Sequence, residues 1–104
     1  MIFDKNPSTM NDISLIQEAI KETLGCDSHW ADSKRVTEKF QGQIAWDGVV
    51  EVFDLIGHPK AKRAYGWSYR EGDIDKARVV LGMRPVNSPQ MAVKVAIASK
   101  AREK

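Results

Sequence analysis

The pattern of hydrophobic and polar positions predicts a helix near each end of the chain. Across residues 12–24, apolar residues recur at intervals of three and four, the spacing of one face of an amphipathic helix. Gly25 ends this segment, because glycine adopts the left-handed backbone conformation at low steric cost. Ser88 followed by Pro89 is a helix cap with proline in the first turn, which predicts a second helix over residues 89–102.

Between the two helices, apolar and polar residues alternate with a period of two, which is typical of half-buried strands. The predicted strands cover residues 35–46, 49–56, 62–69 and 76–84. The predicted turns are Asp47-Gly48, Gly57-His58-Pro59-Lys60 and Glu71-Gly72-Asp73. Cys26 to Ser33 is expected to be a loop. Asp-Gly between alternating segments is a strong hairpin signal, because a two-residue type I′ turn needs positive φ at both positions.

The predicted order is therefore α-β-β-β-β-α, a two-layer α+β domain built on a four-stranded antiparallel meander. Residues 1–11 are expected to be a loose lead-in and residues 12–104 the single domain. Both helices are expected on one face of the sheet, where the small residues Ala64, Gly66 and Ser68 leave room for them. The other residues expected on that face are Phe40, Ile44, Trp46, Val49, Phe53, Leu55, Val79, Leu81 and Met83.

The opposite face of the predicted sheet is aromatic and apolar with a basic rim. It receives Val50, Val52, Ile56, Tyr65, Trp67, Tyr69 and Val80, with Lys39, Arg63, Arg78 and Arg84 around them. A large exposed apolar face usually marks an interaction site. We therefore predict a contact surface made of Val50, Val52, Arg63, Tyr65, Trp67, Tyr69 and Arg78.

Several occupants of this face are open. Two copies can stack about a two-fold axis, since Tyr, Trp and Arg are enriched at interface hot spots. Single-stranded nucleic acid can stack its bases on the aromatic row while the cations meet phosphates. A small apolar or aromatic ligand can lie on a concave sheet. In the last alternative, the second helix or the lead-in covers the face as ordinary core. The homodimer is our leading expectation, because aliphatic Val50 and Val52 lie at the centre of the face.

Composition limits the remaining function classes. The chain has 104 residues, 42% hydrophobic and 29% charged, as expected for one globular domain. The formal net charge of +2 is too small to indicate nucleic-acid binding through long-range attraction alone. One cysteine excludes an internal disulfide. The N-terminus has no signal-peptide pattern and no apolar run is long enough to span a membrane, so we expect a cytoplasmic protein.

Candidates for chemistry are few. Cys26 and His29 lie three positions apart and are weighed as a thiolate pair, against the alternative of a cysteine packed behind a helix end. His58 lies in a turn and is expected to be structural. Glu51 lies between valines in a central strand, where burial without a partner would raise the pKa of its carboxyl group, and we expect a neighbour such as Ser68 or Lys62 to satisfy it. We predict no catalytic residue, metal or cofactor.

Two resemblances add to this interpretation. The order of elements resembles a double-stranded RNA-binding domain, but this chain has an extra strand and lacks the lysine pair at the start of the last helix. The stretches 46–53 and 57–67 resemble small uncharacterised bacterial proteins of mobile (integron) gene cassettes. The second resemblance implies a bacterial accessory protein with no known activity or catalytic residues.

Overall fold

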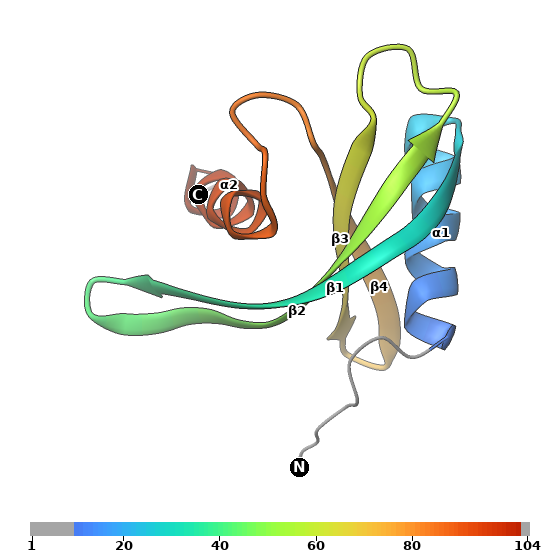
Figure 1. Ribbon diagram of the computed structural model, residues 1–104. Coiled ribbons are helices and arrows are strands. Elements are labelled where there is room, and N and C mark those ends of the chain that lie inside the picture. The colour runs from blue at the N-terminus through green and yellow to red at the C-terminus, as the bar shows by residue number, and fades with distance from the viewer. Residues whose placement is uncertain (1–9, 103–104) are drawn as a thin grey trace.

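The computed structural model describes residues 10–102, with the side chains at positions 10, 11, 40 and 100–102 excepted. The elements are α1 (Met10–Leu24), β1 (Asp27–Phe40), β2 (Gln43–Ile56), β3 (Arg63–Glu71), β4 (Ile74–Leu81) and α2 (Pro89–Arg102). The four strands form one open antiparallel sheet in the order β1-β2-β3-β4 (Figure 1). The predicted α+β class, the order of elements and the meander are confirmed. The lead-in lies outside the described residues up to position 9, and α1 begins at Met10.

The first hairpin differs from its prediction. β1 begins at Asp27, so the loop predicted for Cys26 to Ser33 is wrong. The chain reverses at Gln41-Gly42, where both residues have positive φ (55° and 81°), as a tight two-residue hairpin turn requires. Phe40 and Gln43 are the pair that closes the turn.

Asp47 and Gly48 lie instead in the middle of β2, paired with Thr37 and Val36 of β1. Two side-chain interactions explain this outcome. Asp47 accepts hydrogen bonds across the ladder, and the Trp46 ring lies over Gly48, where an added Cβ would stand 3.1 Å from Cη2 of that ring. The tertiary contacts of these residues therefore override their local preference for a turn.

The absence of a turn at Asp47-Gly48 also changes the face of the sheet on which Trp46 lies. Residues two apart on an uninterrupted strand point the same way, so Trp46 lies on the same side as Val50 and Val52. Trp46 packs against that cluster, not on the face with Phe53 where it was predicted. The register between β2 and β3 is as predicted for two pairs, since Asp54 lies opposite Arg63 and Val52 opposite Tyr65.

The helices lie on opposite faces of the sheet, so the prediction that both cover one face is wrong and the domain has three layers (Figure 1). α1 packs through Ile13, Ile16 and Ile20 on the side of Phe53 and Ala64. α2 packs on the side of Val50, Val52, Tyr65 and Trp67. α1 has an apolar stripe, and α2 packs through Ala92 and Val93. Each face of this sheet is apolar at its centre, so one helix covers each face.

The small residues of β3 provide the floor for α1 that the sequence predicted. A Cβ on Gly66 would stand 2.5 Å from Cγ2 of Ile16, so glycine permits the close approach. Ala64 is fully buried in the same cluster. Ser68 donates a hydrogen bond to Asp12 of α1 at 3.0 Å. Asp12 therefore ties α1 to β3 from within the helix.

The two hairpins of the sheet diverge from a short common centre. The ladder between β2 and β3 runs from Asp54–Arg63 to Glu51–Gly66. Beyond it, residues 34–49 of the β1–β2 hairpin extend as an arm on which α2 lies (Figure 1). The other hairpin, β3–β4, runs away from the arm toward the turn at Gly72.

Candidate functional site

The predicted contact surface separates into a buried part and an exposed part. Tyr65 and Trp67 are only 3% and 6% exposed, and Val50 and Val52 are also buried. Ala92 and Val93 of α2 pack onto these residues and are themselves fully buried. The centre of the face is therefore core beneath α2, which is the covered-face alternative from the sequence, and the expectation of an open face is wrong there.

Three of the predicted residues remain exposed: Arg63, Tyr69 and Arg78. Arg63 lies at the far end of β3 and forms an ion pair with Asp54 across the ladder, 3.4 Å between nitrogen and oxygen. Tyr69 lies outside the part of the sheet that α2 covers and is 40% exposed. Arg78 lies opposite the buried Trp67 on β4. The face that α2 covers is thus open at the end that carries the β3–β4 turn.

This open end forms a small apolar and charged surface. Tyr69 lies opposite Lys76, and Ile74, two residues from Lys76, lies diagonally beside Tyr69 on the same face. Ile74 is 60% exposed. We call Tyr69, Ile74 and Arg78, with Asp73 of the adjacent turn, the turn patch.

The ends of the turn patch carry opposite charges. Among the described residues, neither Asp73 nor Arg78 makes an ion pair with another side chain. Their neighbours are paired, since Lys76 contacts Glu71 at 2.7 Å and Arg70 contacts Asp75 at 3.0 Å. Asp73 and Arg78 are therefore the charges of this surface that are available to a partner.

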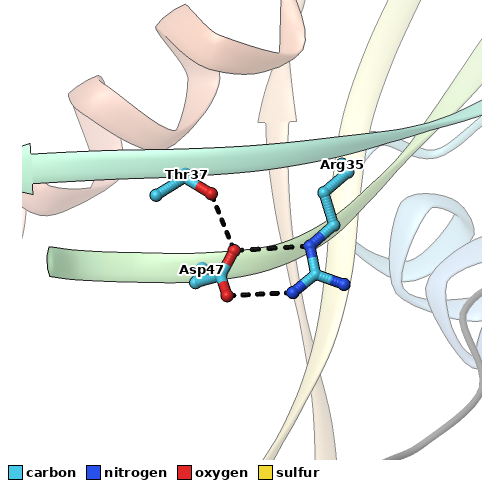
Figure 2. A network of polar contacts seen from close by, with 3 residues as sticks. All are labelled: Arg35, Thr37 and Asp47. Atoms are coloured by element: carbon cyan, nitrogen blue, oxygen red, sulfur yellow. Dashed lines mark hydrogen bonds and ion pairs between the residues drawn. The ribbon is translucent and has the colours of Figure 1, made fainter.

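A separate polar network fixes the arm on the face away from α2 (Figure 2). The Asp47 carboxylate accepts hydrogen bonds from Arg35 (Nε at 3.3 Å, Nη2 at 2.9 Å) and from Thr37 Oγ1 at 2.8 Å. The bonds from Arg35 and then Thr37 hold the pKa of Asp47 below its ordinary value. The network joins β1 to β2 in a hairpin that α2 supports on its other face only.

A second network holds α2 on the arm. Glu38 of β1 is nearly buried and accepts hydrogen bonds from Lys94 at 2.9 Å and from Gln90. The Lys94 ammonium, followed by the Gln90 amide, lowers the pKa of the Glu38 carboxyl group. Glu38 was not singled out from the sequence, because the predicted turn at Asp47-Gly48 gave no reason to place it under a helix.

Glu51 is buried, but with partners other than those expected. It is 3% exposed and accepts hydrogen bonds from Trp30 Nε1 at 2.9 Å and from Ser33 Oγ. Both donors belong to β1 beside the bulge between Trp30 and Asp32. The carboxylate therefore secures an irregular stretch of edge strand. Sequence reasoning missed these donors because it placed them in a loop.

The other candidates for chemistry are not brought together. Cys26 is buried against the α1-side core, whereas His29 is exposed on β1 opposite Asp54. His58 Nδ1 accepts hydrogen bonds from the amides of Lys60 and Ala61 at 3.1 and 2.9 Å, so it shapes the β2–β3 turn. Within residues 10–102, no three metal-ligating side chains form a group suited to a metal ion.

A groove of about 620 Å³ lies between the outer side of α1 and the start of β1. Its lining residues are Ser14, Gln17, Glu18, Lys21, Glu22, Asp27, Ser28, His29 and Ile56. The Lys21–Asp27 ion pair, 2.8 Å, lies on its wall. Ile56 is the one aliphatic side chain in this lining, so the groove does not suit the apolar ligand that the sequence left open.

Ile74 and Asp73 are the surface residues that sequence reasoning missed. The fourth strand was predicted from residue 76, which left both in a turn. The signal was present, because Ile74, Lys76 and Arg78 share the period of two that places Val80 beneath α2.

Neither helix within residues 10–102 is long and apolar enough to cross a membrane. The chain matches no protein-family model, and comparisons with curated proteins and with solved structures found no significant match.

Proposed function

We propose that this chain is a non-enzymatic binding protein that acts as a homodimer, and that two copies meet through the turn patch. The observation that carries the proposal is the exposure of Tyr69 and Ile74, diagonally adjacent, on a face whose centre is buried under α2. An exposed aromatic and aliphatic pair next to a free arginine has the composition of an interface centre.

The turn patch is complementary to itself. A two-fold axis through its middle places Ile74 of each copy against Tyr69 of the other. The same axis brings Asp73 of one copy toward Arg78 of the second, and the reverse, so both free charges gain opposite partners. Charges of opposite sign at the two ends thus favour a second copy of this chain over an unrelated apolar surface.

Nucleic-acid binding is less well supported. A stacking platform needs several aromatic faces open to bases, whereas Tyr65 and Trp67 are buried and only Tyr69 of the row is exposed. The strand cations Arg35, Arg63 and Arg70 are engaged with carboxylates. Phosphates would have to compete with these ion pairs.

The test is the molar mass of the purified chain by light scattering at two widely separated concentrations. We expect a mass that rises from one chain toward two as concentration increases, in a low-salt buffer near pH 7. A mass of one chain at both concentrations would overturn the proposal. A single-stranded oligonucleotide added at low salt tests the nucleic-acid alternative, and saturable binding that Tyr69→Ala removes would replace our proposal with that one.

A further inference from the structure

The two edge strands of the open sheet, β1 and β4, differ in whether side chains form hydrogen bonds to their outward backbone groups. In an antiparallel strand, alternate residues direct both backbone groups to the same neighbour. The Leu55 amide donates to Lys62 O at 2.9 Å, so Leu55 points toward β3 and its partner on β1, Ser28, points outward. By the same alternation across the bulge, Ser33 and Thr37 also present their backbone groups outward.

Side chains cap three of these outward groups on β1. Gln17 of α1 donates to Ser28 O at 3.2 Å, and Gln90 of α2 donates to Thr37 O at 3.1 Å. Between them, the Ser33 amide donates to the Asp32 carboxylate at 2.8 Å, next to the bulge. Natural sheets use bulges and side-chain cover to prevent pairing at an edge. β1 is therefore protected at three points along its outer edge.

The opposite edge, β4, lacks such protection. The Gly82 amide donates to Arg63 O at 2.8 Å, so even-numbered residues of β4 face β3. Asp75, Ala77 and Val79 consequently direct their amides and carbonyls outward. Across residues 10–102, no side chain bonds to these backbone groups. An open ladder edge of this kind is the template used in strand addition.

The charges along β4 indicate what kind of strand it accepts. Lys76 and Arg78 lie on one face, two residues apart. A two-fold pairing of β4 with itself about Ala77 would place Lys76 opposite Arg78 of the second copy, and pairing about either cation places like charges together. Like charges directly opposite are destabilising, so these registers of a second β4 are disfavoured. Carboxylates at alternate positions would instead face both cations.

We propose that β4 binds an extended segment of another protein by strand addition, and that this segment carries acidic residues at alternate positions. The ladder with Asp75, Ala77 and Val79 supplies main-chain hydrogen bonds. Arg78, and Lys76 in exchange with Glu71, select the acidic side chains. The main-chain ladder of this site lies on the strand's edge, whereas the proposed dimer uses the face at Tyr69 and Ile74. Arg78 belongs to both surfaces, so the peptide site is tested on the monomeric protein.

The experiment titrates a short peptide with blocked ends, in which glutamate alternates with valine, into ¹⁵N-labelled protein. It is run at a protein concentration where light scattering gives one chain, so a failed dimer and a failed peptide site are distinguished. We expect the peptide to slow hydrogen exchange of the Ala77 and Val79 amides. Exchange of the amides along the outer edge of β1 should not change. A peptide with lysine in place of glutamate should bind on the order of fivefold more weakly.

Two variants complete the test. Arg78→Glu should lose about fivefold in affinity for the glutamate peptide and gain for the lysine peptide, whereas Lys60→Glu, a charge reversal in an exposed turn, should change neither. Ala77→Pro removes an outward amide and should abolish binding, with its far-ultraviolet spectrum confirming the fold. Protection on β1, no binding at millimolar peptide, or unchanged selectivity in Arg78→Glu would overturn the proposal.

Discussion

Trp46 of the arm and Trp67 of β3 contact each other edge to face, with ring centroids 5.2 Å apart and an interplanar angle of 63°. The contact lies where the β2–β3 ladder has already ended, at Glu51–Gly66. Side-chain packing therefore takes over from backbone hydrogen bonds in joining the two hairpins. Because α2 rests on both hairpins, this pair also supports the helix that covers the sheet.

We predict that Trp67→Ala lowers the free energy of unfolding by about 3–5 kcal/mol, the usual cost of deleting a buried tryptophan side chain. Trp46→Ala, which removes a partly buried ring, should cost less. In a double-mutant cycle measured by urea denaturation, the two should couple by about 0.5–1.5 kcal/mol. Strictly additive effects would show that the rings do not support each other. Tyr69→Ala is the exposed aromatic control, expected to stay within about 0.5 kcal/mol in the monomer.

Gly66→Ala should destabilise the protein by about 1–3 kcal/mol, because the new methyl group would collide with Ile16 and with the Arg78 carbonyl, 3.1 Å away. α1 would have to move off the sheet. Urea denaturation measures the loss, and the amide resonances of Ile13 and Ile20 should shift with it. Ala64→Gly removes a buried methyl from the same floor without a collision, and should cost less. Wild-type stability in Gly66→Ala would mean that α1 does not lie this close.

The hold of Glu38 on α2 should depend on pH. Lys94 and Gln90 lower the pKa of Glu38 from its ordinary value of 4.5, so the carboxylate stabilises the fold above that pH. The contribution is lost as pH falls below about 4.5, through the lowered pKa of the folded state. Protection of the Ala92 and Val93 amides against hydrogen exchange should fall in that window.

In Glu38→Gln, the fall in protection at α2 below about pH 4.5 should be smaller than in the wild type. Asp47→Asn is the matched control. Asp47 also has a lowered pKa, because of Arg35 and Thr37, but it lies on the face of the arm away from α2. If both variants reduced the pH dependence of amide protection in α2 by the same amount, a specific role for Glu38 would be contradicted.

The sequence predicted the elements that local chemistry determines. The period of two identified the strands, Ser88 and Pro89 marked the start of α2, and the Met91 amide indeed bonds to Ser88 Oγ at 3.2 Å. The pairing of Asp54 with Arg63 followed from the Gly57–Lys60 turn alone. Each of these inferences used residues that are neighbours in the chain.

The predictions were wrong where contacts between residues far apart in the sequence determine the structure. Asp47-Gly48 has the sequence of a turn, but Arg35, Thr37 and the Trp46 ring stabilise it as a strand. The residues next to a helix in sequence do not determine which face of the sheet the helix packs against. The position of α2 over Trp67 was therefore not predictable from the residues of α2. Tyr69 and Arg78 were predicted as contact residues and are exposed, whereas Tyr65 and Trp67 were expected to be open and are covered by α2.

The most direct test of the proposed dimer compares two exposed isoleucines by light scattering. Ile74 and Ile44 are 60% and 62% exposed, and each follows a hairpin-turn glycine by two residues, but only Ile74 belongs to the turn patch. Ile74→Asp should raise the dimer dissociation constant at least about tenfold, while Ile44→Asp leaves it unchanged and both variants remain folded. Equal masses for the two variants at every concentration would contradict a dimer formed through Tyr69 and Ile74.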